Sequence, residues 1–242
     1  MAKPLDISII TVAFYEPKSM PKFIDWCMQA GRELDKLGYS WEIVTVHATL
    51  ESSGKDETRA VMEKIAAKNK KVRLVFAPPP SKGKGHCLKL GMKAARGKVF
   101  ALIDTDLQND PRDIPGMLEK MQREDLAFVL SHRVNRVDPW WRLFISKFYN
   151  AYVSLLFGLP IKDAGSQPRL FRAKYVNPDK IKTHRFLIEI EIPWMVYKNG
   201  GTRSAVMPVK HYERKTGKSA VKFSTPFQMG WDALKLRVTG HD

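Results

Sequence analysis

VFALIDTDLQNDP, residues 99–111, places five apolar residues directly before two aspartates that stand one residue apart. A short apolar run of this kind indicates a buried strand. Since residues i and i+2 point to the same side of a strand, a turn that continues it brings Asp104 and Asp106 toward one point. Two carboxylates suit Mg²⁺ or Mn²⁺, and Gln108 adds an amide oxygen at the same spacing. The alternative is a plain turn, because Asp, Asn and Pro are all common in turns.

Similar apolar runs alternate with helical patterns through the first half of the chain. Residues 7–13, 41–46 and 72–76 predict three more strands, and residues 21–37, 57–67 and 87–95 carry apolar side chains at helical spacing. This alternation predicts an α/β fold with a mostly parallel central sheet flanked by helices. In such sheets ligands bind beyond the carboxyl ends of the strands, where Asp104 and Asp106 are expected to lie.

The second half of the chain has a different pattern. Residues 128–130 form a short apolar run, residues 140–157 are mostly aromatic or aliphatic, and a last helical pattern lies near residues 229–238. Neither a repeat nor a flexible linker separates the two halves. We therefore expect a single domain over residues 1–242.

Composition restricts the partners and the compartment. The formal net charge of +16 favours polyanionic partners, namely nucleic acid, anionic lipid or phosphorylated substrates, although a solvated basic surface is the plain alternative. The longest uncharged stretch, residues 148–161, is shorter than the roughly 20 residues of a membrane span. The N-terminus lacks the apolar core of a signal peptide, and Cys27 and Cys87 are expected to be buried thiols. We predict a cytoplasmic protein, free or peripheral to the cytoplasmic membrane face.

The region around the two aspartates resembles a known enzyme family. Residues 81–111, SKGKGHCLKLGMKAARGKVFALIDTDLQNDP, resemble the family 2 glycosyltransferases of the GT-A fold (Rossmann-like) in the glycines around Lys84, the Ala-x-Gly turn at 95–97 and the Asp-x-Asp-Leu-Gln motif. Three later segments also resemble that family: DAGSQPRLFR at 163–172, FLIEIE at 186–191 and VMPVKHYERKTGKS at 206–219. The most similar branch contains the dolichol-phosphate mannosyltransferases and related polyprenyl-phosphate glycosyltransferases.

The resemblance implies a nucleotide-sugar donor. Its diphosphate is expected to bind a divalent ion held by Asp104, Asp106 and Gln108, because such an ion neutralises charge on the leaving diphosphate. Lys84 is expected near the donor as a fixed positive charge, unless it is an ordinary surface lysine. The resemblance thus divides the chain into a donor half, about residues 1–110, and an acceptor half, about residues 111–242.

Two strand ends depart from the family pattern. At the end of the first strand the chain reads Val12, Ala13, Phe14, Tyr15 and Glu16, where the family has Pro-Thr-Tyr-Asn-Glu. Val12, Phe14 and Glu16 are the expected donor contacts there. After the second strand, His47 and Ala48 occupy the positions of two aspartates that usually bind the nucleoside. His47 is therefore either a replacement nucleoside contact or an ordinary histidine at a strand end.

Residues 140–157, WWRLFISKFYNAYVSLLF, predict a helix that is hydrophobic on nearly all sides. Its polar residues Arg142, Ser146, Asn150 and Ser154 recur every four positions and form one stripe. Such a helix is either buried with a satisfied polar stripe, or lies at a membrane interface, which Trp and Tyr favour. The interfacial alternative presents Arg142 and Ser146 to a lipid phosphate.

The resemblance to the dolichol-phosphate branch also implies an acceptor site. An arginine and a serine four residues later contact the acceptor phosphate in that branch, and Arg142 and Ser146 match them. Arg133 and Arg214 match two further arginines. Arginine gives permanently charged, bidentate recognition of phosphate. The expected catalytic residues are Asp104 and Asp106, which hold the ion, and Arg142 and Arg214, which bind the acceptor phosphate.

Three functions follow from these patterns, in decreasing order of support. The first is a metal-dependent, inverting transfer of a sugar to a polyprenyl phosphate, where an ionised acceptor needs no general base. Glu189 and Glu191 are possible bases only for a hydroxyl acceptor, and otherwise hold Arg169, Arg214 or nearby loops. The second is glycosylation of nucleic acid, for example of a modified DNA base, which the net charge favours. The third is a non-catalytic protein that binds nucleotides or lipid.

Overall fold

The computed structural model describes residues 4–48, 57–78, 83–136, 139–183, 186–213 and 225–240. Within these residues, seven strands form one sheet in the order β3-β2-β1-β4-β6-β5-β7. All strand pairs are parallel except those that β6 makes with β4 and β5. The strands are β1 Leu5–Ala13, β2 Trp41–Ala48, β3 Val72–Ala77, β4 Gly97–Leu102, β5 Phe128–Val134, β6 Arg169–Arg172 and β7 Ser204–Lys210.

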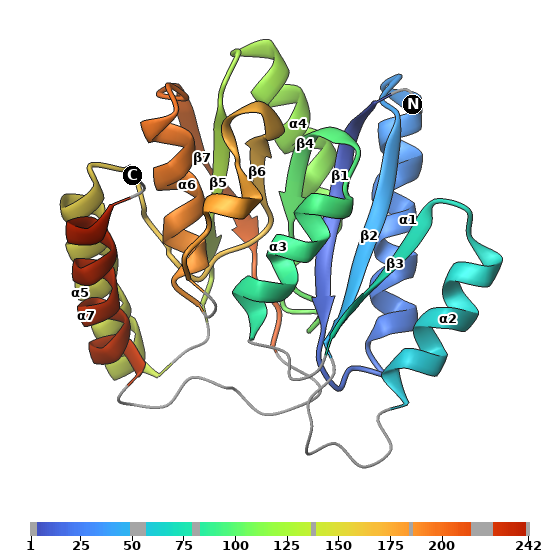
Figure 1. Ribbon diagram of the computed structural model, residues 1–242, viewed down its shortest axis with the longest axis horizontal. Coiled ribbons are helices and arrows are strands. Elements are labelled where there is room, and N and C mark those ends of the chain that lie inside the picture. The colour runs from blue at the N-terminus through green and yellow to red at the C-terminus, as the bar shows by residue number, and fades with distance from the viewer. Residues whose placement is uncertain are drawn as a thin grey trace.

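Helices cover both faces of this sheet (Figure 1). Buried side chains of α1, α2 and α4 pack on one face, and those of α3, α5, α6 and α7 on the other. The helices are α1 Met20–Lys36, α2 Thr58–Lys68, α3 Lys84–Ala94, α4 Ile114–Arg123, α5 Trp140–Phe157, α6 Ile188–Lys198 and α7 Thr225–Thr239. The prediction of a mostly parallel α/β fold is confirmed.

Alternation along β1 explains why this strand lies inside the sheet. Ile7 and Ile9 pack into the core on the α1 side, whereas Ile10 and Val12 pack into the core on the α3 side. Successive side chains of a strand point to opposite faces, so a strand covered on both faces is apolar at nearly every position. The same cores bury Cys27 and Cys87 as free thiols, as predicted.

The helix expected at 87–95 begins earlier, at Lys84. Gly83 has φ +104°, a conformation that side chains disfavour, and it turns the chain into the helix. Lys84 therefore occupies the first position of α3, at the edge of the sheet where the parallel strands end. The short apolar run at 128–130 begins a strand, β5, which continues to Val134 and pairs with β7 along its whole length.

Candidate active site

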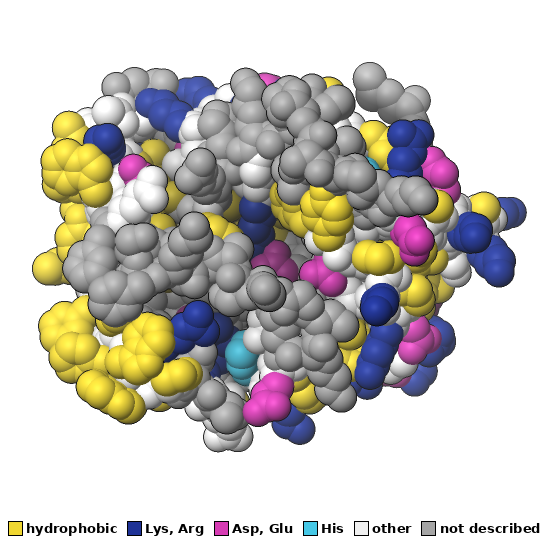
Figure 2. Space-filling model, turned by 90° about the horizontal axis from the view of Figure 1, so that it is seen from below, with side chains coloured by type: hydrophobic (Ala, Val, Ile, Leu, Met, Phe, Trp, Pro, Cys, Tyr) yellow, Lys and Arg dark blue, Asp and Glu magenta, His cyan; other side chains and the backbone are white. Residues whose placement is uncertain are grey.

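The candidate site lies beyond the carboxyl ends of the parallel strands, at the lower edge of the sheet in Figure 1. Seen from that side, acidic and basic side chains lie inside a hollow in the surface (Figure 2). The chain leaves β4 beside β1, because Ile103 N–H donates to the Ile10 carbonyl and the Thr105 hydroxyl donates to the Val12 carbonyl. These contacts place the acidic turn after β4 next to the end of β1.

The acidic turn is a defined structure. Leu107 has φ +61°, and this left-handed residue turns the chain so that Gln108 N–H donates to the Asp106 carboxylate at 3.1 Å. The segment after β7 covers the turn, since Tyr212 N–H donates to the Gln108 carbonyl at 2.9 Å and the Gln108 amide lies 3.4 Å from the His211 ring. A left-handed conformation at a non-glycine residue is strained and is common at functional sites.

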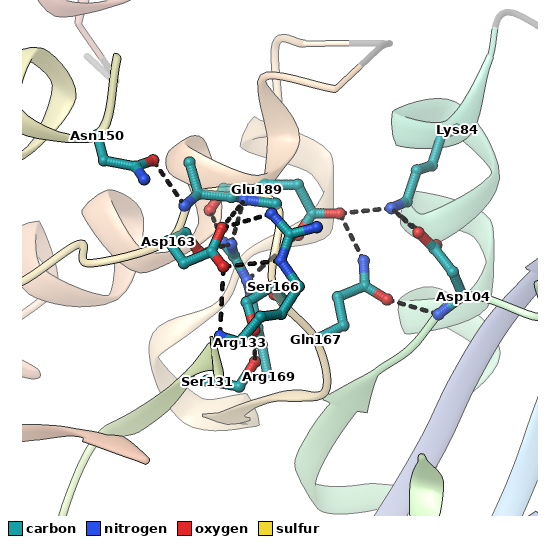
Figure 3. A network of polar contacts seen from close by, with 12 residues as sticks. Lys84, Asp104, Ser131, Arg133, Asn150, Asp163, Ser166, Gln167, Arg169 and Glu189 are labelled. Carbon is teal, nitrogen blue, oxygen red and sulfur yellow. Dashed lines mark hydrogen bonds and ion pairs between the residues drawn. The ribbon is translucent and has the colours of Figure 1, made fainter. Parts of the chain in front are cut away.

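Lys84 reaches two carboxylates from different parts of the chain (Figure 3). Its ammonium lies 2.7 Å from Oδ1 and 2.9 Å from Oδ2 of Asp104, and 2.6 Å from Oε1 of Glu189 on α6. The side chain of Lys84 is only 13% exposed and that of Glu189 only 7%, whereas that of Asp104 is 36% exposed. Lys84 is thus no ordinary surface lysine.

The charges of this group are strongly coupled. Burial raises the pKa of Asp104, and the nearby carboxylates Asp106 and Glu189 raise it further against the effect of Lys84. Burial also opposes ionisation of Glu189, but Lys84 and Arg169 outweigh burial and lower the pKa of Glu189. Although burial disfavours its charge, the two carboxylates raise the pKa of Lys84, so Lys84 is an ammonium ion at neutral pH.

A second layer of contacts holds these residues in place (Figure 3). The Gln167 amide donates to Glu189 at 2.8 Å, and its oxygen accepts from Asp104 N–H at 2.5 Å. The guanidinium of the buried Arg169 donates to the backbone carbonyls of four residues, Asp163, Ala164, Ser166 and Glu189. It also lies 3.5 Å from the Glu189 carboxylate. The position of Glu189, and through it that of Lys84, therefore depends on Arg169 and Gln167.

The acidic turn fits a divalent ion that takes few protein ligands. Among the described residues, no three His, Cys, Asp or Glu side chains are grouped to hold an ion by themselves. Burial, together with the nearby carboxylates Asp106 and Glu189, raises the pKa of Asp104, and a bound cation would stabilise the ionised form of this carboxylate. Mg²⁺ usually binds one or two carboxylates and takes its other ligands from phosphates and water. Asp104 and Asp106 suit that role.

The predicted donor contacts lie around the ends of β1 and β2. Val12 is buried in β1 and Phe14 is half-buried beyond it. The Glu16 carboxylate accepts from the Ser19 hydroxyl at 2.5 Å, at the start of α1. His47 is the penultimate residue of β2, is only 3% exposed and packs its ring edge-on against Phe76.

The predicted acceptor residues separate into two groups. Arg133 at the end of β5 forms an ion pair with the buried Asp163 at 2.7 Å, which lowers the pKa of Asp163 against the effect of burial. Arg142 and Ser146 lie on α5, where the Ser146 hydroxyl accepts from Arg136 at 3.0 Å. Arg214 lies outside the described residues.

The polar stripe of α5 faces the protein. Asn150 donates to the Lys162 carbonyl at 3.0 Å and accepts from Ala164 N–H at 2.9 Å, and Ser154 contacts the Leu159 carbonyl. The segment 159–164 also contains Asp163, the partner of Arg133. Polar contacts therefore run from Asn150 of α5 through Ala164, Arg169 and Glu189 to Lys84 (Figure 3).

Sequence reasoning missed Gln167 and Asp163 as parts of this site. Both belong to the segment DAGSQPRLFR, whose likeness to a family segment was the only signal available. The two suggested bases also differ in their surroundings. Glu189 contacts Lys84, whereas Glu191 is fully buried and accepts the backbone N–H groups of Lys182 and Thr183. Glu191 thus stabilises a loop, which is the structural role predicted as the alternative to that of a base.

The fold and the acidic turn after β4 define a GT-A type α/β protein. The family model described as Glycosyl transferase family 2 matches residues 8–185. The chain therefore belongs to this family. Glucosyl-3-phosphoglycerate synthase from Mycobacterium tuberculosis, solved with Mn²⁺, UDP and phosphoglyceric acid, has a similar fold. Its TM-score is 0.70 at 16% identity, over 96% of this chain and 78% of that one.

Two curated relatives match nearly the whole chain. Dodecaprenyl-phosphate galacturonate synthase from Rhizobium johnstonii is 25% identical over 96% of this chain and 66% of its own length. Undecaprenyl-phosphate 4-deoxy-4-formamido-L-arabinose transferase from Shewanella sediminis is 26% identical over 96% of this chain and 67% of its own length. The chain therefore spans about two thirds of the length of these relatives. The predicted family is confirmed, and both of these relatives are named for a polyprenyl phosphate.

Proposed function

We propose that this protein is a metal-dependent, inverting glycosyltransferase that moves a sugar from a nucleotide-sugar donor to a polyprenyl phosphate. The observation that carries the proposal is the Asp104 and Asp106 turn beside the buried Lys84, at the strand edge where ligands bind in α/β sheets. The names of the relatives support a polyprenyl-phosphate acceptor over nucleic acid.

The donor binds to the first half of the chain, about residues 1–110. Asp104 and Asp106, with Gln108, would hold the divalent ion beside the donor diphosphate. A bound Mg²⁺ or Mn²⁺ supplies Lewis-acid stabilisation of the leaving diphosphate. Lys84 adds a fixed positive charge next to the same group. Val12, Phe14, Glu16 and His47 line the strand ends at which the nucleoside is placed.

The acceptor phosphate binds to the second half, about residues 111–242. Arg133, Arg142 and Ser146 orient it, together with Arg214. One of its oxygens is ionised at neutral pH and attacks the anomeric carbon from the face opposite the diphosphate. The bond from that carbon to the diphosphate oxygen breaks, and the electron pair leaves with the diphosphate. No proton has to be removed, so orientation and electrostatics provide most of the rate enhancement.

Replacing Arg142 by alanine tests the acceptor assignment. Transfer to a short-chain polyprenyl phosphate is expected to fall by about 10- to 100-fold, since a hydrogen bond to a charged group contributes about 1.5–3 kcal/mol. Lys147→Ala removes an exposed cation from the same helix and is the matched control. Mn²⁺-dependent thermal stabilisation by the donor is measured in parallel and should be equal in both variants. Full lipid transfer by Arg142→Ala contradicts the assignment.

The face formed by α5 and α7 is proposed as the surface that contacts the membrane. No helix among the described residues is long and apolar enough to span a bilayer. The two helices lie side by side, joined by the bond from the Tyr152 hydroxyl to the Gly230 carbonyl. Their outer sides are apolar, with Phe148 64% and Leu155 87% exposed, and hydrophobic side chains gather at this side of the molecule in Figure 2.

The charges of the same face also suit an anionic membrane. Helix α5 carries no Asp or Glu, and Asp232 is the single acidic residue of α7. Apart from Arg142, which belongs to the polar stripe, the basic residues of the two helices are Lys147, Lys235 and Arg237. Aromatic side chains bordered by Lys and Arg are typical of surfaces that bind anionic lipid headgroups.

Replacing Phe144 and Phe148 together by serine is expected to weaken binding to vesicles of phosphatidylglycerol and phosphatidylcholine by at least tenfold. Each exposed ring that enters the bilayer boundary contributes on the order of 1 kcal/mol. Vesicle sedimentation measures the effect, and Tyr197→Ser, which changes an exposed aromatic residue of α6, is the control. Equal vesicle binding by the double variant and the control contradicts the proposed membrane surface.

A further inference from the structure

The ammonium of Lys84 contacts Asp104, one of the two carboxylates proposed to hold a metal ion. It lies within 2.9 Å of both carboxylate oxygens of Asp104, and its third contact is Glu189 at 2.6 Å. A divalent ion that binds Asp104 must share these two oxygens with Lys84. Two cations on one small carboxylate repel each other, so Lys84 and the ion compete for Asp104.

The charges of the site indicate why an arriving diphosphate would end this competition. Lys84 and Arg169 provide two positive charges, and Asp104, Asp106 and Glu189 provide three negative charges. The site is thus close to balance without an ion, and a divalent ion alone leaves it with an excess positive charge. An arriving diphosphate is an anion that offers Lys84 new acceptor oxygens and binds the ion at the same time.

We propose that Lys84 is an internal counter-ion that holds Asp104 until the donor diphosphate arrives and then transfers to that diphosphate. This inference rests on the proposed function. Its consequence is that the divalent ion binds weakly alone and tightly together with a nucleoside diphosphate. Because coupling between two ligands is reciprocal, the ion raises the affinity for the diphosphate by the same factor.

The surroundings of Lys84 support a side chain that can change partners without leaving the site. Glu189 is buried and is held by Gln167 and Arg169, so its carboxylate remains a fixed contact for the ammonium. Asp104, in contrast, is 36% exposed and lies on a turn. The flexible stem and three donors of lysine allow one bond to be exchanged while another persists.

The test measures binding of Mn²⁺ alone by electron paramagnetic resonance, without any nucleotide. Lys84→Met is expected to bind Mn²⁺ at least tenfold more tightly than the unmodified protein. The control is Lys93→Met, which removes the same charge from the same helix at an exposed position paired with Asp179. Equal Mn²⁺ affinity in Lys84→Met and the unmodified protein overturns the proposal.

The second measurement repeats the titration with UDP and with GDP as probes. In the unmodified protein one of them is expected to raise the affinity for Mn²⁺, and in Lys84→Met this gain is expected to be at least tenfold smaller. If Lys84→Met acted only by removing a positive charge, it would change the affinity for Mn²⁺ but not the factor by which the nucleotide raises that affinity. An unchanged factor therefore overturns the proposal. If neither nucleotide affects Mn²⁺ binding by the unmodified protein, the proposed function itself fails.

A third variant keeps the test decisive if Lys84→Met folds poorly. The double variant Lys84→Met with Glu189→Gln removes one charge of each sign, and it should bind Mn²⁺ more tightly than Glu189→Gln alone. In Glu189→Gln the ammonium retains Asp104 as its charged partner, so the affinity for Mn²⁺ should fall below that of the unmodified protein. If the affinities for Mn²⁺ do not follow this order, Lys84 and the ion do not compete for Asp104. Circular dichroism spectra of all variants establish that they are folded.

Discussion

Asp106→Ala is expected to lower the rate of sugar transfer by on the order of 10³-fold, because the loss of an ion that stabilises the leaving group costs several kcal/mol. Asp106 is mostly buried and accepts the Gln108 N–H, so alanine removes both a metal ligand and the bond that shapes the turn. The same variant should lose the Mn²⁺-dependent thermal shift caused by nucleotide sugars. A screen of nucleotide sugars with Mn²⁺ on the unmodified protein identifies the donor for this comparison.

Asp106→Asn separates the two roles of this residue. The amide oxygen of asparagine still accepts the Gln108 N–H but carries no charge, so the turn is kept and the ion is lost. We expect it to be nearly as inactive as Asp106→Ala while unfolding at close to the temperature of the unmodified protein. The control is Asp179→Ala, an exposed carboxylate paired with Lys93. A Mn²⁺-dependent shift that persists in Asp106→Asn contradicts the metal assignment.

Arg169→Met is expected to lower the free energy of unfolding by about 3–5 kcal/mol, the usual cost of removing one partner from a buried ionic network. Arg169 is 1% exposed, and its guanidinium satisfies backbone carbonyls of the segment 163–166 as well as that of Glu189. Methionine fills much of the volume but leaves these acceptors and the Glu189 carboxylate without a buried donor.

Urea denaturation measures this loss, with Arg172→Met as the control. Arg172 belongs to the same strand but is partly exposed, and its partners are the Leu126 carbonyl and the side chains of Gln122 and Asp125 near the surface. We expect the control to lose about 1 kcal/mol, as for one hydrogen bond of ordinary strength. Equal losses in the two variants contradict the special role of Arg169.

Local patterns were sufficient to predict the framework of the site. The apolar run at 99–103 and the two aspartates after it are neighbours in sequence, and a strand end brings such neighbours to one edge of a parallel sheet. The turn at Gly83 before α3 is equally local, since its combination of φ +104° and ψ −176° is one that glycine adopts far more readily than residues with a side chain. Both features depend on the conformation of only a few consecutive residues.

The faces of α5 show where local patterns were insufficient. Spacing predicted a polar stripe on this helix, but left open whether the helix was buried with that stripe satisfied or lay at a membrane interface. Asn150 joins the segment 162–164, and α7 packs alongside, so the apolar outer side remains exposed. That orientation depends on contacts with other elements, which no periodicity within the helix encodes.

The sequence by itself determined the α/β framework, the family and the place of the acidic turn, because each follows from residues close together in the chain. Only the tertiary structure decided that Lys84 meets Glu189, which lies 105 positions away on α6, and that Arg169 and Gln167 hold Glu189 in place. The physical reason is burial. Charged groups removed from water require partners, and the packing of distant elements determines which partners are within reach.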